Sequence, residues 1–202
     1  MKVLYIDSKL KDLERFNPAE SEIQKLPKKL FLAYSLQYKS AAEAIKKRLE
    51  ENKIKVSNFQ QVLGCSKINT KDPILLISEG RFHLLNLFLQ SPEVWFLDSN
   101  KLMKIPSSEI ESLRNKRKSS LIKFLKAQNI GILVSTKPGQ ENLSLALKIK
   151  SQLKRKGKNP YIFLSNNIDL GQFENFKIES WVNTSCYGLS YDNSNIIDYK
   201  EI

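Results

Sequence analysis

The chain has 202 residues, of which 41% are hydrophobic and 27% are charged, as is typical of a folded globular protein with one large domain or two small ones. No apolar run approaches the roughly 20 residues that cross a bilayer, and Asp7 interrupts the N-terminal apolar run before a signal peptide can form. We therefore expect a cytoplasmic protein that makes no contact with a membrane.

The chain is strongly basic, with 33 Lys and Arg against 21 Asp and Glu and a formal net charge of +12. Such a charge favours an anionic partner, such as nucleic acid or an acidic protein surface. The lysines are spread along the sequence, and the densest basic run, Arg114–Lys118, falls in a predicted helix. The run is therefore either a solvated helix face or a functional patch.

The first half of the chain alternates short apolar runs with helical patterns. Residues 73–77 are continuously apolar, which predicts a central parallel strand covered on both faces. The other predicted elements are strands at 30–34, 55–59 and 94–97, a helix at 40–51, and a helix that begins near His83.

The same alternation restarts after a long basic helix predicted from Ser108 to Ala127. Strands are expected at 130–134, 160–164 and 180–184, and a helix at 143–156 that ends at Gly157. The pattern predicts an α/β protein made of two similar Rossmann-like domains, residues 1–112 and 113–202, with mainly parallel sheets flanked by helices.

Polar residues follow a buried strand in both halves. Ser35 and Gln37 follow the first strand, Ser135 and Gln140 follow its counterpart, and Gly80 follows the central strand. Ligands bind at the carboxyl ends of parallel strands, where helix N-termini offer free N–H groups. Serine and glutamine are also ordinary residues at the start of a helix, so the pattern alone leaves both interpretations open.

Two cysteines, Cys65 and Cys186, lie far apart in a chain for which we expect a reducing compartment, so we expect no disulfide. Together with the only histidine, His83, they cannot complete a four-ligand zinc site. Each is by itself either a small core residue or a metal ligand.

In combination, several segments resemble the diphthamide synthase family. They are Tyr34–Tyr38, the Leu63–Ser66 loop around Cys65, Glu79–His83 with its Gly-Arg-Phe-His sequence, Val134–Gln140, and the Trp181–Asp192 segment that contains Cys186. Their order and spacing are similar to those of the family over nearly the whole chain.

The resemblance implies a 3-amino-3-carboxypropyl transferase. In the family, three similar domains each offer one cysteine to a [4Fe–4S] cluster whose open iron binds S-adenosylmethionine, and a radical derived from that cofactor modifies a histidine of elongation factor 2. Cys65 and Cys186 would then be the metal ligands, as suits soft thiolates. No catalytic residue is implied beyond the cluster.

The same resemblance implies which residues hold S-adenosylmethionine: Ser35, Gln37, Gly80, Arg81, His83, Gln140 and Asp192. Arg81 is suited to a bidentate grip on a carboxylate. His83 is equally well explained as a hydrogen-bonded structural residue at the start of a helix.

The sequence departs from the family at three points. Nothing in it matches the N-terminal domain and its cysteine, Tyr187-Gly188 follows Cys186 where Pro-Arg is usual, and Ser78 stands where glycine is common. We therefore expect one part of a split enzyme, active only with a separate chain that supplies the N-terminal domain and third cysteine. The alternatives are an inactive accessory homologue and a basic nucleic-acid-binding α/β protein, although no nucleic-acid-binding motif is present.

Overall fold

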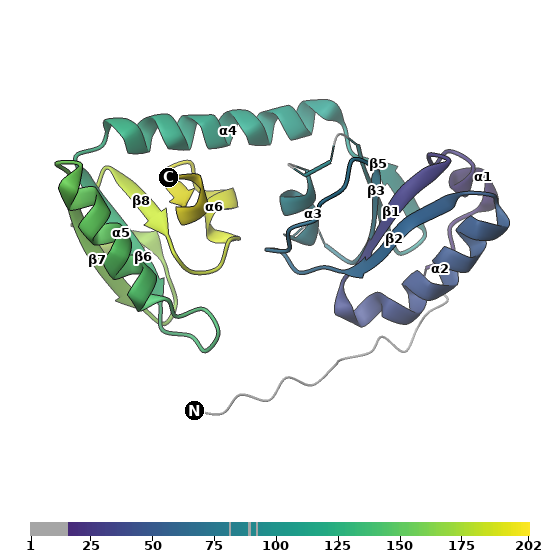
Figure 1. Ribbon diagram of the computed structural model, residues 1–202, viewed down its shortest axis with the longest axis horizontal. Helices are drawn as coiled ribbons and strands as arrows, with labels where there is room; N and C mark the ends of the chain where they lie inside the picture. The colour runs from purple at the N-terminus through teal and green to yellow at the C-terminus, as the bar shows by residue number, and fades with distance from the viewer. Residues whose placement is uncertain (1–15, 81, 89, 92) are drawn as a thin grey trace. The chain divides into compact units, whose positions relative to one another are not determined.

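The computed structural model describes residues 16–80, 82–88, 90–91 and 93–202, and the chain divides into two compact units (Figure 1). Unit 1 is Met1–Ile110 and unit 2 is Glu111–Ile202. Each contains one mainly parallel sheet flanked by helices, so the predicted fold class is confirmed. No helix among the described residues combines the length and the apolar character that a bilayer crossing needs.

Unit 1 contains a five-stranded sheet in the order β2-β1-β3-β4-β5. All neighbouring strands are parallel except β4 and β5, which form an antiparallel pair. The strands are β1 (Lys29–Tyr34), β2 (Lys55–Gln61), β3 (Ile74–Ile77), β4 (Val94–Asp98) and β5 (Lys101–Lys104). Every residue of β3 is buried, which confirms the predicted central strand.

Helices cover the two faces of this sheet. The amphipathic helix α2 (Lys39–Glu51) buries Ala41, Ala42, Ile45 and Leu49 against Leu30, Leu32 and Tyr34 of β1. Figure 1 shows α3 (Phe82–Leu87) on the other side of the sheet from α2. Both helices follow a strand directly or through a short loop, as parallel strands require. A short helix, α1 (Glu20–Ile23), adds Ile23 to the α2 side of the core.

Unit 2 contains an all-parallel sheet in the order β7-β6-β8-β9. Its strands are β6 (Asn129–Ser135), β7 (Asn159–Ser165), β8 (Ser180–Asn183) and β9 (Ile196–Asp198). One face packs against α4 (Ser107–Lys126) and α5 (Leu143–Arg155), through Phe124, Ala146, Ile149 and Leu153. The opposite face is covered by irregular chain and a short 3-10 helix, η2 (Leu170–Phe173).

A close glycine–tryptophan contact lies on that second face. A Cβ atom added to Gly131 would lie 2.2 Å from Cε3 of Trp181, which is the neighbouring residue on β8. The Trp181 ring also packs edge-on against Phe163, with 4.8 Å between the ring centroids. Glycine at position 131 therefore lets the indole lie flat against the backbone of β6.

The long helix α4 is joined to the sheet of unit 2 at its C-terminal end. Lys158 Nζ donates hydrogen bonds to the carbonyls of Phe124, Leu125 and Ala127, at 3.4, 3.0 and 2.6 Å. The last carbonyls of a helix lack partners within it, and a cation there also suits the helix dipole. We refer to this arrangement as the Lys158 cap. Gly157, with φ +76°, makes the turn that ends α5 and brings Lys158 to this place.

Several elements were not predicted from the sequence. These are β5, β9, α1, the short helix α6 (Leu189–Asp192) and the 3-10 helices, which include η1 (Leu36–Tyr38) and η3 (Tyr199–Glu201). The basic run on α4 is neither wholly solvated nor a uniform patch. Arg114 and Lys118 are exposed, whereas Arg117 is mostly buried in an ion pair.

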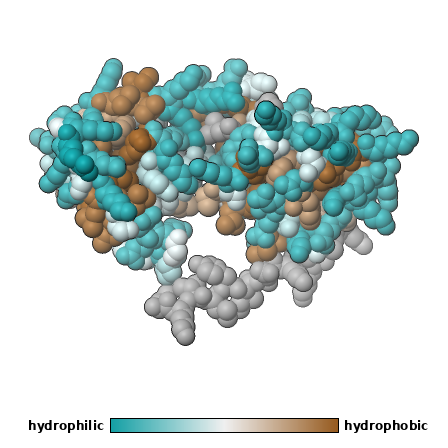
Figure 2. All heavy atoms as spheres, viewed as in Figure 1, coloured by the Kyte–Doolittle hydropathy of each residue, from teal (hydrophilic) through white to brown (hydrophobic). Residues whose placement is uncertain are grey.

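Figure 2 shows hydrophobic atoms at the surface of unit 2 near α5 and β7, between polar atoms. The exposed apolar residues of these two elements are Leu147, Tyr161 and Leu164. They are single residues of a kind that most folded surfaces carry.

Candidate functional site

In unit 1, two hydroxyl side chains meet at the carboxyl ends of neighbouring strands. Ser35 follows β1 and Ser78 follows β3, and their Oγ atoms lie 3.2 Å apart in a buried hydrogen bond. Ser78 also donates to the carbonyl of Glu79 at 3.2 Å. These bonds fix the start of the two loops at the edge where parallel sheets bind ligands.

A pocket of about 300 Å³ opens beside these serines. Its lining includes three residues predicted from the sequence, Ser35, Gln37 and His83, and also Ser78 and Glu79. Tyr38, another lining residue, donates from its hydroxyl to Glu79 Oε2 at 2.9 Å. Gly80 follows Glu79 with φ +72°, a backbone conformation that side chains with a Cβ rarely adopt. Arg81 lies outside the described residues.

His83 begins α3 together with Phe82 and is half-buried in the wall of this pocket. Burial lowers the pKa of its imidazole from the ordinary value of 6.5. The ring is therefore neutral near pH 7 and has one N–H donor and one acceptor nitrogen for a neighbouring polar group.

Cys65 lies in a tight turn that is attached to α3. Leu63 N donates to Ser66 Oγ at 2.8 Å, and Ser66 N donates back to the carbonyl of Leu63 at 3.0 Å. The carbonyl of Ser66 then accepts from two side-chain amides, Asn86 Nδ2 at 2.7 Å and Gln90 Nε2 at 3.0 Å. We call Asn86 and Gln90 the amide clamp. The turn is thereby held in place while Cys65 itself is exposed.

In unit 2, Cys186 follows β8 at the carboxyl edge of the sheet. Its carbonyl accepts from Asn183 Nδ2 at 2.8 Å and from Leu189 N, at the start of α6, at 3.1 Å. Asn183 is fully buried and also accepts from Ser185 N at 3.0 Å. Cys186 is half-exposed and, like Cys65, is a free thiol. Both cysteines are therefore reachable side chains on fixed loops.

Residues that the sequence did not assign to the site surround the segment after Cys186. Arg117 of α4 pairs with Glu201 at 2.7 Å, and its guanidinium lies over the rings of Tyr187 and Tyr191. Burial is the main reason that the pKa values of both tyrosines are raised, so both are neutral. The sequence did not show that these residues meet, because they come from three separate segments of unit 2.

The other predicted residues of unit 2 lie on three separate segments. Ser135 ends β6, is buried like Ser35, and donates from its backbone N to Ser185 Oγ at 2.9 Å. Gln140 is exposed in a turn closed by its own N–H, which donates to the carbonyl of Lys137 at 3.0 Å. Asp192 ends α6.

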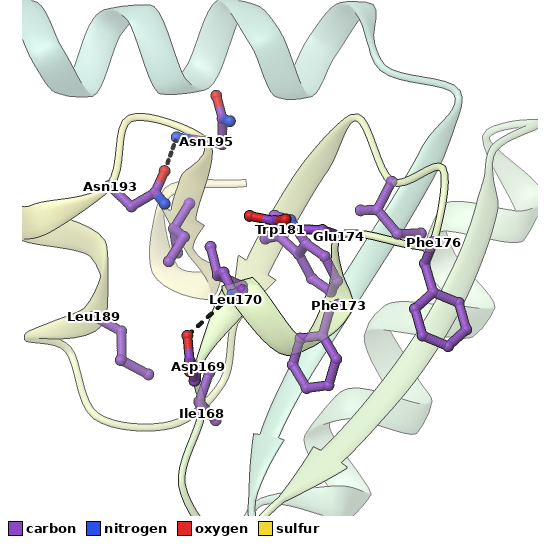
Figure 3. A pocket seen from close by; sticks show the side chains of 13 residues that line it. Ile168, Asp169, Leu170, Phe173, Glu174, Phe176, Trp181, Leu189, Asn193 and Asn195 are labelled. Atoms are coloured by element: carbon purple, nitrogen blue, oxygen red, sulfur yellow. Dashed lines mark hydrogen bonds between the residues drawn. The ribbon is translucent and has the colours of Figure 1, made fainter.

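Unit 2 also contains a hollow beside η2. Its volume is about 680 Å³, and aromatic side chains including Phe173, Phe176 and Trp181 line it (Figure 3). Asp169, on its rim, caps η2 by accepting from Gly171 N at 3.0 Å. Ser135, Gln140 and Cys186 are not among the described residues that line this hollow, so we do not assign the candidate site to it.

The donor chemistry suits two thiolate ligands of an iron–sulfur cluster. Cys65 and Cys186 are both free and accessible, and thiolates are the ligands that such clusters take. Within the described part of the chain no three His, Cys, Asp or Glu residues group closely enough to hold a metal ion. Each unit thus offers one thiol rather than a complete site.

Comparison with known proteins gives consistent results. The family described as putative diphthamide synthesis protein matches residues 1–201. A 2-(3-amino-3-carboxypropyl)histidine synthase of Pyrococcus horikoshii is 27% identical over 184 residues, which are 85% of this chain and 54% of that protein. Subunit 1 of the synthase of Encephalitozoon cuniculi is 25% identical over 95% of this chain and 58% of its own length.

Among solved structures, the crystal structure of Dph2 from Pyrococcus horikoshii with a 4Fe-4S cluster is similar, with a TM-score of 0.77 and 27% identity. The match covers 90% of this chain and 58% of that one. The chain therefore spans between 54% and 58% of the length of these relatives.

Proposed function

The chain belongs to the family of putative diphthamide synthesis proteins, and from this premise we propose that it is part of a split 2-(3-amino-3-carboxypropyl)histidine synthase. Its reaction transfers the 3-amino-3-carboxypropyl group of S-adenosylmethionine to a histidine of elongation factor 2. The observation that carries the proposal is the pair of free cysteines, one in each unit, each on a hydrogen-bonded loop.

In the proposed assembly, Cys65 and Cys186 are two of the three thiolate ligands of a [4Fe–4S] cluster. Residues 1–112 act as the family's middle-type domain and residues 113–202 as its C-terminal-type domain. The third thiolate comes from an N-terminal-type domain on a separate chain. When bound, the cluster supplies the electron for radical cleavage of S-adenosylmethionine.

The chain's own polar residues bind and orient the cofactor. Ser35, Gln37 and His83 share one pocket wall, where hydroxyl, amide and neutral imidazole groups offer donors and acceptors to the amino and carboxylate groups of the methionine part. Gly80 lets the backbone approach the cofactor closely, and Arg81 binds the carboxylate of the cofactor. Gln140 and Asp192 contribute from unit 2.

The formal net charge of +12 suits capture of an acidic partner, the protein substrate or the separate chain, in the cytoplasm. Charge of this kind acts mainly on the association rate and is screened by salt. Complex formation should therefore slow as the salt concentration rises, whereas the chemical step should change less.

The proposal is tested by purifying the chain anaerobically, alone and with a separately expressed N-terminal domain of the family. The mixture should bind iron, absorb light in the near-visible range and modify elongation factor 2. Cys65→Ser and Cys186→Ser should each abolish iron binding, whereas Ser119→Ala, an exposed change on α4, should not. A mixture that forms no complex and binds no iron would overturn the split enzyme and favour an accessory homologue.

A further inference from the structure

We propose that Arg117 is a positioning residue that holds Cys186 in the orientation needed to bind a metal cluster. The role assigned to Cys186 rests on the proposed function, whereas the effect of Arg117 on the thiol does not. The proposal begins from the short segment Tyr187–Tyr191, which directly follows the cysteine.

The guanidinium of Arg117 is the centre of a compact group. Its carbon lies 5.1 Å from the ring centroid of Tyr187 and 5.2 Å from that of Tyr191. The two rings are nearly perpendicular, with centroids 5.3 Å apart. A cation over two partly desolvated aromatic rings is attracted to both.

The same group is tied to the C-terminal end of the chain. Arg117 Nη1 pairs with Glu201 Oε1 at 2.7 Å, and both side chains are largely buried, with 19% and 25% of their surface exposed. The Tyr187 hydroxyl reaches the same Glu201 oxygen at 3.4 Å. One carboxylate therefore joins the arginine and the tyrosine next to Cys186.

A second contact from α4 reinforces the first. Lys116, the neighbour of Arg117, donates from Nζ to the carbonyl of Tyr191. Within the segment, Ser190 Oγ donates to the carbonyl of Tyr187 at 2.8 Å. Two successive residues of one helix thus hold both ends of the segment that follows the cysteine.

These contacts have a direct consequence for the thiol. Asn183 and Leu189 fix the Cys186 carbonyl, and Arg117 fixes the residue that comes next in the chain. With both sides held, the backbone that carries the Cys186 thiol is fixed in place. Lys200 Nζ also lies over the Tyr187 ring, at 5.5 Å from its centroid, so without Arg117 Tyr187 keeps one cation of two. Tyr191 loses the guanidinium and Glu201 loses its ion pair with Arg117, so the loop loosens around the thiol.

The test measures Cys186 directly. The chain has two cysteines, so Cys65→Ser leaves Cys186 as the only thiol, and its reaction rate with Ellman's reagent can be followed in the folded protein. In this background Arg117→Gln should raise the rate about threefold or more, because a loosened loop exposes the thiol more often. Arg114→Gln, an exposed change on the same helix, should leave the rate unchanged.

A change that keeps the charge separates positioning from general loss of stability. Arg117→Lys keeps a cation that can pair with Glu201 but loses the planar guanidinium over the rings, so its rate should lie between those of the parent and of Arg117→Gln. A rate for Arg117→Lys as high as that of Arg117→Gln, or equal rates for Arg117→Gln and Arg114→Gln, would overturn the proposal. If Arg117→Gln unfolds the chain, Glu201→Gln replaces it, with the same rise expected and an unchanged rate overturning the proposal.

Iron binding is then measured in parallel with the separate N-terminal domain. A parent mixture that binds no iron would defeat the proposed function, while the thiol rates would still decide the role of Arg117. If the parent binds iron, Arg117→Gln should bind less and Arg114→Gln as much. Undiminished iron in Arg117→Gln would overturn the inference alone.

Discussion

The side-chain amide of Asn183 donates a hydrogen bond to the carbonyl of Cys186 at 2.8 Å, while its oxygen accepts from Ser185 N. Asn183→Ala should lower the free energy of unfolding by about 1–3 kcal/mol, because the Ser185 N–H loses its acceptor and the Cys186 carbonyl keeps only the donor Leu189 N. Denaturant unfolding measures this change. Asn183→Asp keeps the acceptor but loses the donor, so its Cys186 thiol should also react faster; an unchanged thiol rate would contradict this role.

The amide clamp on the Cys65 turn predicts a matched effect in unit 1. Asn86→Ala in a Cys186→Ser background should raise the reaction rate of the Cys65 thiol, because the Ser66 carbonyl then keeps only Gln90 as a side-chain donor. The double change Asn86→Ala with Gln90→Ala should raise the rate further. Gln60→Ala, exposed on β2, is the control. Equal thiol reaction rates in the single variant, the double variant and the control would show that the turn keeps its conformation without the amide clamp.

Arg81 is predicted to bind the carboxylate of S-adenosylmethionine. In the reconstituted enzyme, Arg81→Ala should weaken binding about tenfold or more, because a charged hydrogen-bonding group is lost. Calorimetric titration measures the dissociation constant. Arg155→Ala, on an exposed part of α5, should change it little. Equal effects from the two changes would mean that Arg81 has a structural role.

The Gly131–Trp181 contact predicts a specific overpacking effect. Gly131→Ala should destabilise the protein by about 1–3 kcal/mol, because the new methyl group overlaps the indole. Trp181→Phe removes part of that ring, so Gly131→Ala should cost less in the Trp181→Phe background. Urea unfolding of the two single variants and the double variant gives the coupling free energy between the two substitutions. Changes in the free energy of unfolding that simply add would show that the contact is not the cause.

His83 predicts a pH dependence of stability. Its folded-state pKa lies below the ordinary value, so the unfolded chain binds a proton first as the pH falls. The stability linked to neutral His83 is complete above about pH 6.5 and is lost as the pH falls from there toward the folded-state pKa. Urea unfolding at about pH 7.5 and pH 5.5 should show this loss in the parent and a smaller one in His83→Gln.

Asp198 changes the stability with pH in the opposite direction to His83. Burial raises the pKa of its carboxyl, so its contribution to stability falls as the pH rises through the acidic range. Both proteins in the His83 comparison retain Asp198, so its effect cancels. A parent and a His83→Gln variant with the same pH dependence would contradict the prediction for His83.

The sequence was most informative where burial is strongest. The apolar run of β3 and the helical pattern of residues 40–51 predicted a central strand and a helix that the structure confirms. Strand β5 was missed because its sequence begins and ends with lysine and its residues are largely solvated. Strand β9 was missed because three residues are too short for a periodic pattern.

The candidate site was predictable in part for a related reason. Ser35, Gln37 and His83 follow buried strands, so the sheet itself brings them to one pocket. The amide clamp and Arg117 act across 20 to 24 and about 70 residues of sequence, and their side chains look like ordinary solvated polar groups when read in order. Pairings of this range depend on the folded chain and leave no local signal.

The Lys158 cap has a consequence for local dynamics. Helix ends usually fray, and their amide protons exchange with solvent faster than those of the helix middle. Three carbonyls at the end of α4 are bonded to a side chain that begins the approach to β7, so the last turn can open only when that junction opens too. Hydrogen exchange should therefore protect the final turn of α4 to nearly the same degree as the start of β7, and Lys158→Met should uncouple the two.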